Sequence, residues 1–136
     1  FVWNHFMLTT RSCIKTVSLL LTLLLSACSS KPYVGEIETM EGVYTWGHEV
    51  HSFQPCNTDK YSWVEGQESV LKPLIEEASK LQAEQEEPYQ PIYVKIKVEV
   101  EPQVTTGFAA DYDGAIKILA VQETHASVPT QCKAPL

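Results

Sequence analysis

The chain has 136 residues, of which 17 are acidic and 10 are basic, so its formal charge at neutral pH is −7. A length of this order suits one small folded domain rather than several. An acidic chain without a basic cluster is poorly suited to the phosphate backbone of nucleic acid, so we expect no nucleic-acid partner.

The first 27 residues have the pattern of an export signal. Met7 is the expected start, after an upstream extension of residues 1–6, and two basic residues follow it. The uncharged run at 17–25 is shorter than the roughly 20 apolar residues that a bilayer span needs. A basic start, a short apolar run and small residues are typical of a signal peptide. We therefore expect residues 1–27 to be removed.

The end of this run, L-S-A-C at positions 25–28, resembles the lipobox of bacterial lipoproteins. The resemblance implies that Cys28 is acylated, that the chain is cut before it, and that residues 28–40 form a lipidated tether. The alternative is an ordinary signal with an incidental cysteine. Two serines follow Cys28 with no Asp, which by enterobacterial sorting rules favours the outer membrane, with the domain facing the periplasm.

The mature chain would be more acidic than the precursor. The signal carries two basic and no acidic residues, so eight basic residues remain against 17 acidic ones and the formal charge becomes −9. Anionic lipid heads would repel such a domain. We therefore expect its attachment to the membrane to come from the acyl chains alone.

Three short strands are predicted between residues 41 and 64. In the stretch G-V-Y-T-W, alternation places Tyr44 and Trp46 on one face of the first strand. An extended pattern resumes after Gly47 and ends at Phe53, and a third strand follows at 61–64. We expect the Tyr and Trp residues of these strands to lie in the core and barrel wall, rather than to form a ligand platform.

One helix and two longer strands complete the domain. Between residues 68 and 87 the apolar positions recur at helical spacing; they are Val70, Leu71, Leu74, Ile75, Ala78 and Leu81. Apolar and polar residues then alternate over 91–102, and the last strand is predicted at 115–125. The order β-β-β-α-β-β is mainly β with one helix. It is the arrangement of an OB-fold, a small, partly open Greek-key barrel, here expected over residues 41–132.

Two cysteines remain once the signal and Cys28 are set aside. Cys56 and Cys132 are an even pair in an oxidising compartment, which favours a disulfide between them. The alternative is two separate thiols, one of them a metal ligand or a nucleophile.

The stretch T-W-G-H-E-V-H contains the candidate metal ligands His48, Glu49 and His51. Neighbouring side chains of a strand point to opposite faces, so two histidines three residues apart converge only if a turn intervenes. A zinc site also needs three or four ligands in tetrahedral geometry. A hairpin with exposed histidines is the simpler interpretation. Asp111 and Asp113 could likewise hold calcium, although a solvated loop is preferred.

The stretch G-V-Y-T-W-G-H-E-V-H-S-F-Q-P-C, followed by Tyr61 and the helix, resembles the C-terminal OB-type domain of the NlpE family of bacterial outer-membrane lipoproteins. The similarity covers about 42–132. The matching positions are Gly42, Tyr44, Phe53, Cys56, Tyr61 and Cys132. The resemblance implies a role in copper homeostasis or surface sensing. One departure is that the family's N-terminal barrel, with its C-x-x-C motif, is not found in this sequence.

Together these features predict a non-enzymatic outer-membrane lipoprotein with one OB-like domain that acts as an envelope binding or stress-sensing module. We expect no cofactor, attachment to the membrane through the acyl chains, and an envelope protein as partner. The alternative is a periplasmic metal-tolerance lipoprotein that binds copper or zinc through His48, Glu49 and His51.

Overall fold

The computed structural model describes residues 33–132. The expected signal peptide, the acylated Cys28 and the first residues of the expected tether lie outside the described residues. The predicted lipid anchor therefore stays a prediction from the sequence.

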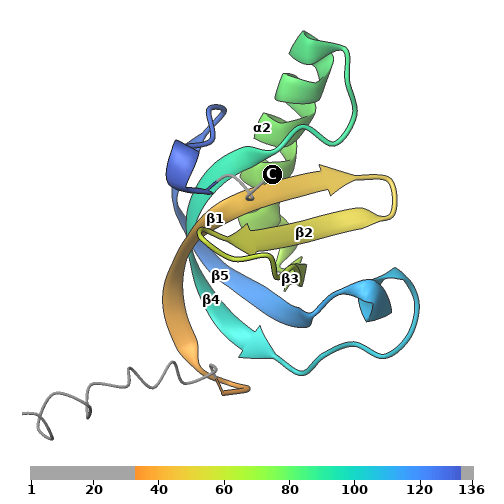
Figure 1. Ribbon diagram of the computed structural model, residues 1–136, viewed down its shortest axis with the longest axis vertical. Coiled ribbons are helices and arrows are strands. Elements are labelled where there is room, and N and C mark those ends of the chain that lie inside the picture. The colour runs from red at the N-terminus through yellow and green to blue at the C-terminus, as the bar shows by residue number, and fades with distance from the viewer. Residues whose placement is uncertain (1–32, 133–136) are drawn as a thin grey trace, which may run out of the picture. The chain divides into compact units, whose positions relative to one another are not determined.

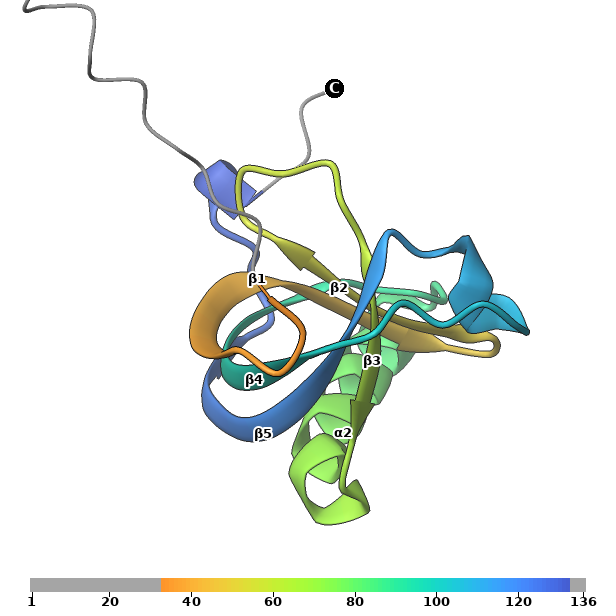
Figure 2. The same cartoon turned by 90° about the horizontal axis from the view of Figure 1, so that it is seen from below.

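Five strands close into a barrel in the order β1-β2-β3-β5-β4 (Figures 1 and 2). The strands are β1 (Ile37–Gly47), β2 (Val50–Pro55), β3 (Ser62–Gly66), β4 (Ile92–Glu101) and β5 (Gly114–His125). β1 pairs antiparallel with both β2 and β4, β4 pairs antiparallel with β5, and β3 pairs in parallel with β5. This mainly β architecture with one helix confirms the predicted small OB-like barrel.

The first strand begins earlier than the sequence pattern indicated. β1 starts at Ile37 and pairs with β4 from Ile37↔Glu99 onward, so residues 37–40 belong to the barrel rather than to a tether. The pattern hid this strand because its first apolar residues, Ile37 and Met40, are three residues apart and so face opposite sides, which breaks the alternation. Pairing with the long β4 supplies the hydrogen bonds that make this acidic segment extended.

The inner face of the barrel follows the predicted alternation. Tyr44 is fully buried, and Trp46 packs against the core from a partly buried position. The core residues are Tyr44, Phe53, Val64, Leu71, Leu74, Ala78, Ile92, Val94, Ile96, Val98, Ile116 and Ile118. Only glycine fits at position 42. A Cβ there would lie 2.6 Å from the Phe53 ring and would also overlap the carbonyl oxygen of Gln54.

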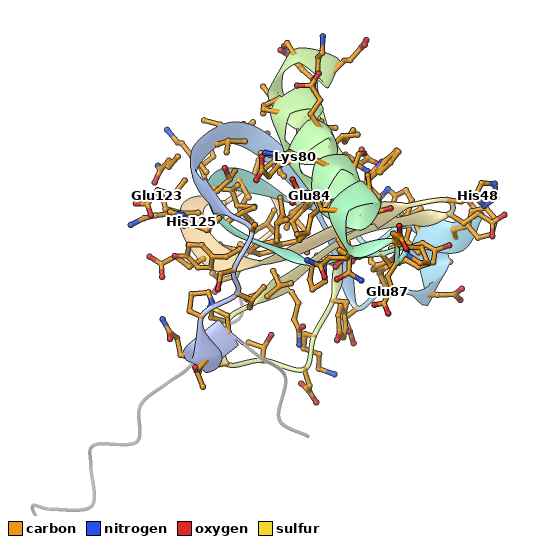
Figure 3. All side chains as sticks on the ribbon, turned by 90° about the horizontal axis from the view of Figure 1, so that it is seen from above. His48, Lys80, Glu84, Glu87, Glu123 and His125 are labelled. Carbon is orange, nitrogen blue, oxygen red and sulfur yellow. A yellow bond between two sulfur atoms is a disulfide. The ribbon has the colours of Figure 1, made fainter. Side chains whose placement is uncertain are left out.

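The helix α2 (Glu68–Gln85) contacts β1 and β5 (Figures 1 and 3). Its predicted apolar stripe is confirmed, with Leu71, Leu74 and Ala78 buried. Pro73 lies inside the helix as its sixth residue rather than in the first turn, because the helix begins at Glu68. Within residues 33–132, no helix is long and apolar enough to cross a membrane.

The outer face of β4 is polar, with one exception. Lys95 pairs with Glu41 at 3.3 Å, opposite it in the β1–β4 register, which is a stabilising cross-strand arrangement. The exception is Tyr93, which alternates with the inward-facing apolar residues of β4 and yet is only 8% exposed. Its ring stacks on that of His125, its partner in β5, with ring centroids 5.7 Å apart.

A disulfide joins the segment after β2 to the segment after β5. Cys56 directly follows β2, and Cys132 ends the 3-10 helix η2 (Thr130–Cys132) after β5. Their Cα atoms lie 4.1 Å apart, and Cys132 is 2% exposed. The bridge therefore fastens the segment after β5 to the end of β2, as the sequence predicted, and neither thiol remains to act as a ligand.

Loss of this disulfide should destabilise the domain strongly. The bridge spans a sequence separation of 76 residues, and a loop of this length corresponds to about 4.5 kcal/mol in the chain-entropy model. We expect reduction, or the double change Cys56→Ala with Cys132→Ala, to lower the melting temperature by at least about 10 °C. Thermal unfolding with and without reductant measures this. Labelling of both thiols in the unfolded, unreduced protein would contradict the bridge.

Candidate ligand-binding groove

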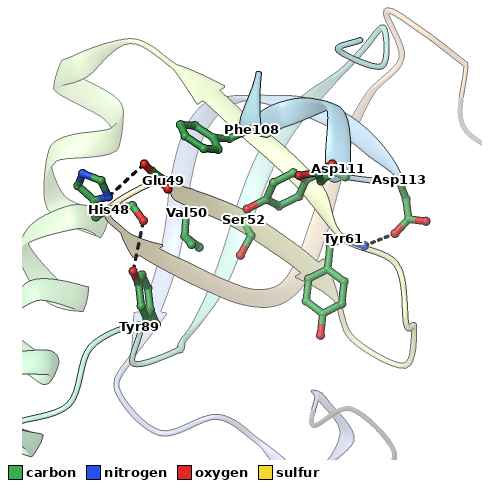
Figure 4. A pocket seen from close by; sticks show the side chains of 10 residues that line it. His48, Glu49, Val50, Ser52, Tyr61, Tyr89, Phe108, Asp111 and Asp113 are labelled. Carbon is green, nitrogen blue, oxygen red and sulfur yellow. Dashed lines mark hydrogen bonds and ion pairs between the residues drawn. The ribbon is translucent and has the colours of Figure 1, made fainter. Parts of the chain in front are cut away.

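A groove of about 590 Å³ opens on one side of the barrel (Figure 4). Its walls come from the β1–β2 turn, β2, the residue before β3, the loop before β4 and the loop between β4 and β5. The last of these loops contains the 3-10 helix η1 (Phe108–Asp111). Segments that are far apart in the sequence thus contribute side chains to one concave surface.

Three exposed aromatic rings line the groove. Phe108 is 55% exposed, and Tyr61 and Tyr89 are each 43% exposed. Large apolar side chains are usually buried, so rings that gather in a concave surface offer stacking area to a ligand. Tyr61 was expected in the barrel wall, and the structure places it in the groove instead.

Two residues that line the groove, one in the β1–β2 turn and one in the loop before β4, have a strained backbone conformation. Glu49 (φ 63°) and Tyr89 (φ 58°) both occupy the left-handed region, which is unfavourable for residues other than glycine. The Tyr89 hydroxyl donates a hydrogen bond of 3.3 Å to the carbonyl oxygen of His48. Its ring lies where a side chain at Gly47 would be, so glycine there permits the contact. Strain of this kind concentrates at functional sites.

The opposite wall is fixed by Asp113. Its carboxylate accepts a hydrogen bond of 2.9 Å from the backbone N–H of Tyr61, and its own N–H donates to the Tyr61 carbonyl oxygen at 2.9 Å. The Lys60 ammonium lies 3.3 Å from the same carboxylate. The Tyr61 N–H, and then Lys60, hold the pKa of Asp113 below its ordinary value. Asp113 therefore anchors the β4–β5 loop to the residue before β3, and this role explains its position better than calcium binding does.

Tyr112 joins the same loop to β3. Its ring packs edge-on against Trp63, with the ring centroids 5.4 Å apart, and Gln103 Nε2 donates to its carbonyl oxygen at 2.9 Å. These contacts position the loop before any ligand binds. A preformed wall reduces the entropy lost on binding.

The charged residues of the groove are acidic. Glu49, Asp111 and Asp113 line it, and none of its ten lining residues is Lys or Arg. Because carboxylates repel anions and attract cations, the groove suits a neutral or basic ligand rather than a phosphate.

The structure does not bring the three predicted metal ligands together. His48 Nδ1 lies 3.6 Å from Glu49 Oε1 at the exposed tip of the turn. His51 points to the barrel interior, where a hydrogen bond of 2.8 Å joins its Nε2 to the hydroxyl of Tyr44. The turn thus places the histidines on different sides. In the part of the chain that the structure describes, no group of three His, Cys, Asp or Glu side chains could hold a metal ion.

His125 does not complete a histidine cluster either. Figure 3 shows it at the opposite end of the molecule from His48. It lies 3.8 Å from Glu123 and stacks on Tyr93. Its role is therefore in the packing of β4 against β5.

The half-buried His51 and the buried Tyr44 are both uncharged at neutral pH. Burial lowers the pKa of His51 to about 4 and raises that of the Tyr44 hydroxyl. The ring of His51 also meets Trp63 edge-on, with the ring centroids 5.8 Å apart. The pair forms a polar contact at the edge of the core, next to the groove but facing away from it.

The folded protein keeps His51 neutral, whereas the unfolded chain lets it take up a proton. A fall in pH should therefore lower the free energy of unfolding of the protein. The stabilisation is complete above the unfolded pKa of about 6.5 and is lost as the pH falls towards the folded value of about 4. After allowance for partial exposure, we expect the free energy of unfolding to fall by about 1–2 kcal/mol more between pH 7 and 4.5 in the parent than in His51→Gln. Urea unfolding at a series of pH values measures this, with the exposed His125→Gln as matched control. Equal slopes in the parent and His51→Gln would contradict the assignment.

Comparisons of the chain with protein-family models, with curated proteins and with solved structures found no match. The resemblance to the C-terminal domain of the NlpE family accordingly stays a prediction. The fold and the groove are established by the geometry alone.

The sequence pattern did not identify most of the groove. Phe108, Tyr112 and Tyr89 lie in connecting loops, where neither alternation nor helical spacing marks a residue. A usable signal was present, since Phe108 follows Gly107 and Tyr89 follows Pro88. Binding residues lie disproportionately on loops that a rigid scaffold positions, so large aromatic residues in such loops are candidates for a binding surface.

Proposed function

We propose that this chain is a non-enzymatic outer-membrane lipoprotein whose OB-like barrel binds a segment of another envelope protein in the groove. The observation that carries the proposal is the gathering of Tyr61, Tyr89 and Phe108 on a groove whose walls are fixed in advance. OB-folds bind their ligands on the face of strands two and three, between the first hairpin loop and the loop before the last strand. The groove lies in this position. Its position supports the proposal by analogy with other OB-folds.

The chemistry of the groove favours a peptide of neutral or basic composition. Aromatic rings can stack on apolar or guanidinium groups, and the carboxylates of Glu49 and Asp111 can accept hydrogen bonds from basic side chains. The expected absence of a nucleic-acid partner agrees with this acidic lining. We prefer binding of a partner to the metal-tolerance alternative, because His51 is engaged with Tyr44 and not with His48.

A photo-crosslinking amino acid at position 108 tests the groove in intact cells. We expect irradiation to give one discrete adduct of higher mass from position 108, several-fold weaker when Tyr61→Ser is also present. The matched control places the same amino acid at Ala83, an exposed position of α2 that does not line the groove. No adduct at position 108, or the same adducts from both positions, would count against the groove as the binding site.

The lipid anchor is tested separately by Cys28→Ser. The parent protein should fractionate with the outer membrane and enter the detergent phase in a phase-partition assay. The variant should be left as an uncleaved or soluble product, because no thiol remains to carry the diacylglycerol. Continued partition of Cys28→Ser into detergent would refute the anchor without affecting the groove.

A further inference from the structure

The described chain begins with a hydrogen-bonded turn, Tyr33 to Glu36. The N–H of Glu36 donates to the carbonyl oxygen of Tyr33 at 2.9 Å, and Gly35 has a φ of 84°, which suits glycine. The Tyr33 N–H also donates to Glu36 Oε2 at 2.9 Å. The turn is fastened to the end of β4, since Gly35 N–H donates to the Val100 carbonyl oxygen at 2.7 Å and Val100 N–H donates to that of Glu36 at 2.9 Å.

The turn and the start of β1 present apolar side chains to the outside. Tyr33 is 77% exposed, Val34 is 64% exposed and Ile37 is 55% exposed. Within residues 33–132 the structure exposes six large hydrophobic side chains, and the other three line the groove. Single exposed apolar residues are common, but three within five consecutive residues, two on the turn and one at the start of β1, make a patch that indicates a contact surface. We call Tyr33, Val34 and Ile37 the N-terminal patch.

The length of chain before the patch identifies what it contacts. Only four residues lie between Cys28 and Tyr33, so the two are five residue steps apart. An extended chain spans at most about 3.6 Å per residue, or roughly 18 Å over these five steps. The polar layer on each side of a bilayer is itself roughly 5–8 Å thick. If Cys28 carries the acyl chains, the N-terminal patch cannot move far from the lipid surface. No other surface is held so close to it by the covalent chain.

We propose that the N-terminal patch is a membrane contact, in which Tyr33, Val34 and Ile37 enter the interfacial layer and fix the orientation of the barrel. The inference rests on the lipid anchor of the proposed function. Tyrosine is enriched at this depth because its ring is apolar and its hydroxyl stays hydrated. The carboxylate of Glu36 keeps the insertion shallow, and the net negative charge of the chain favours zwitterionic over anionic lipid. The acyl chains still supply the attachment, and the patch adds orientation.

The orientation leaves the groove accessible. β1 runs from the N-terminal patch to the β1–β2 turn that borders the groove, so these two features lie at opposite ends of one strand (Figure 1). A barrel held at the membrane by the start of β1 would therefore direct this turn away from the lipid, towards a partner in the periplasm.

Spin labels on the intact mature lipoprotein test this contact. The label is placed at Val34→Cys, and at Ala83→Cys on α2 as matched control, and the protein is bound to vesicles of phosphatidylethanolamine and phosphatidylcholine. We expect the label at position 34 to have a ratio of oxygen to nickel-complex accessibility several-fold higher than the label at position 83. The same label on the Cys28→Ser protein in solution should be as accessible to nickel as the control.

The outcomes separate the two proposals. Failure of the lipoprotein to float with the vesicles would refute the anchor. Flotation with equal, water-like accessibility at positions 34 and 83 would leave the anchor intact and overturn the membrane contact. Protection of position 34 in the soluble Cys28→Ser protein would also overturn it, because the shielding would then come from the protein rather than from lipid.

Discussion

Five residues of β3 pair in parallel with five residues of β5, from Ser62↔Gly114 to Gly66↔Ile118, and this ladder closes the sheet. Without it, β3 would be joined to the barrel only by its short pairing with β2, and an open sheet would expose Val64 and Ile116. A closed sheet has no free edge strands and surrounds one apolar interior. The remaining features of the domain depend on this closure.

Closure also builds the groove. Because β3 and β5 run in the same direction, the residues before each strand lie side by side, which places Tyr61 against Asp113. The loop that ends at Asp113 then carries Phe108 and Tyr112 over β2 and β3. The chain separation between Tyr61 and Asp113 is large, yet the parallel ladder makes them hydrogen-bonded neighbours. The groove is thus a consequence of topology, and the aromatic residues in the loops give it its chemistry.

Much of the fold could be predicted from local patterns. The alternation through β4, the apolar stripe of α2 and the even cysteine pair each depend on residues that are near in sequence or limited in number. The start of β1 was missed because Ile37 and Met40 lie on opposite faces, which breaks the alternation, and because its pairing with β4 is long-range. Alternation places His51 on the same face as Phe53, but its hydrogen bond to Tyr44 depends on how β1 and β2 pair across the hairpin. The groove required the β3–β5 ladder, which no local pattern reveals.

The most direct test of this account is an NMR measurement of contacts between β3 and β5. The parallel register predicts inter-strand nuclear Overhauser effects linking the backbone of Trp63 and Glu65 to that of residues 115–117. It also predicts slow exchange of the amide protons in this ladder, because closure leaves no open edge there. Such contacts would establish the closed barrel on which the groove depends. Their absence, with fast amide exchange in β3, would show an open sheet and would contradict the account.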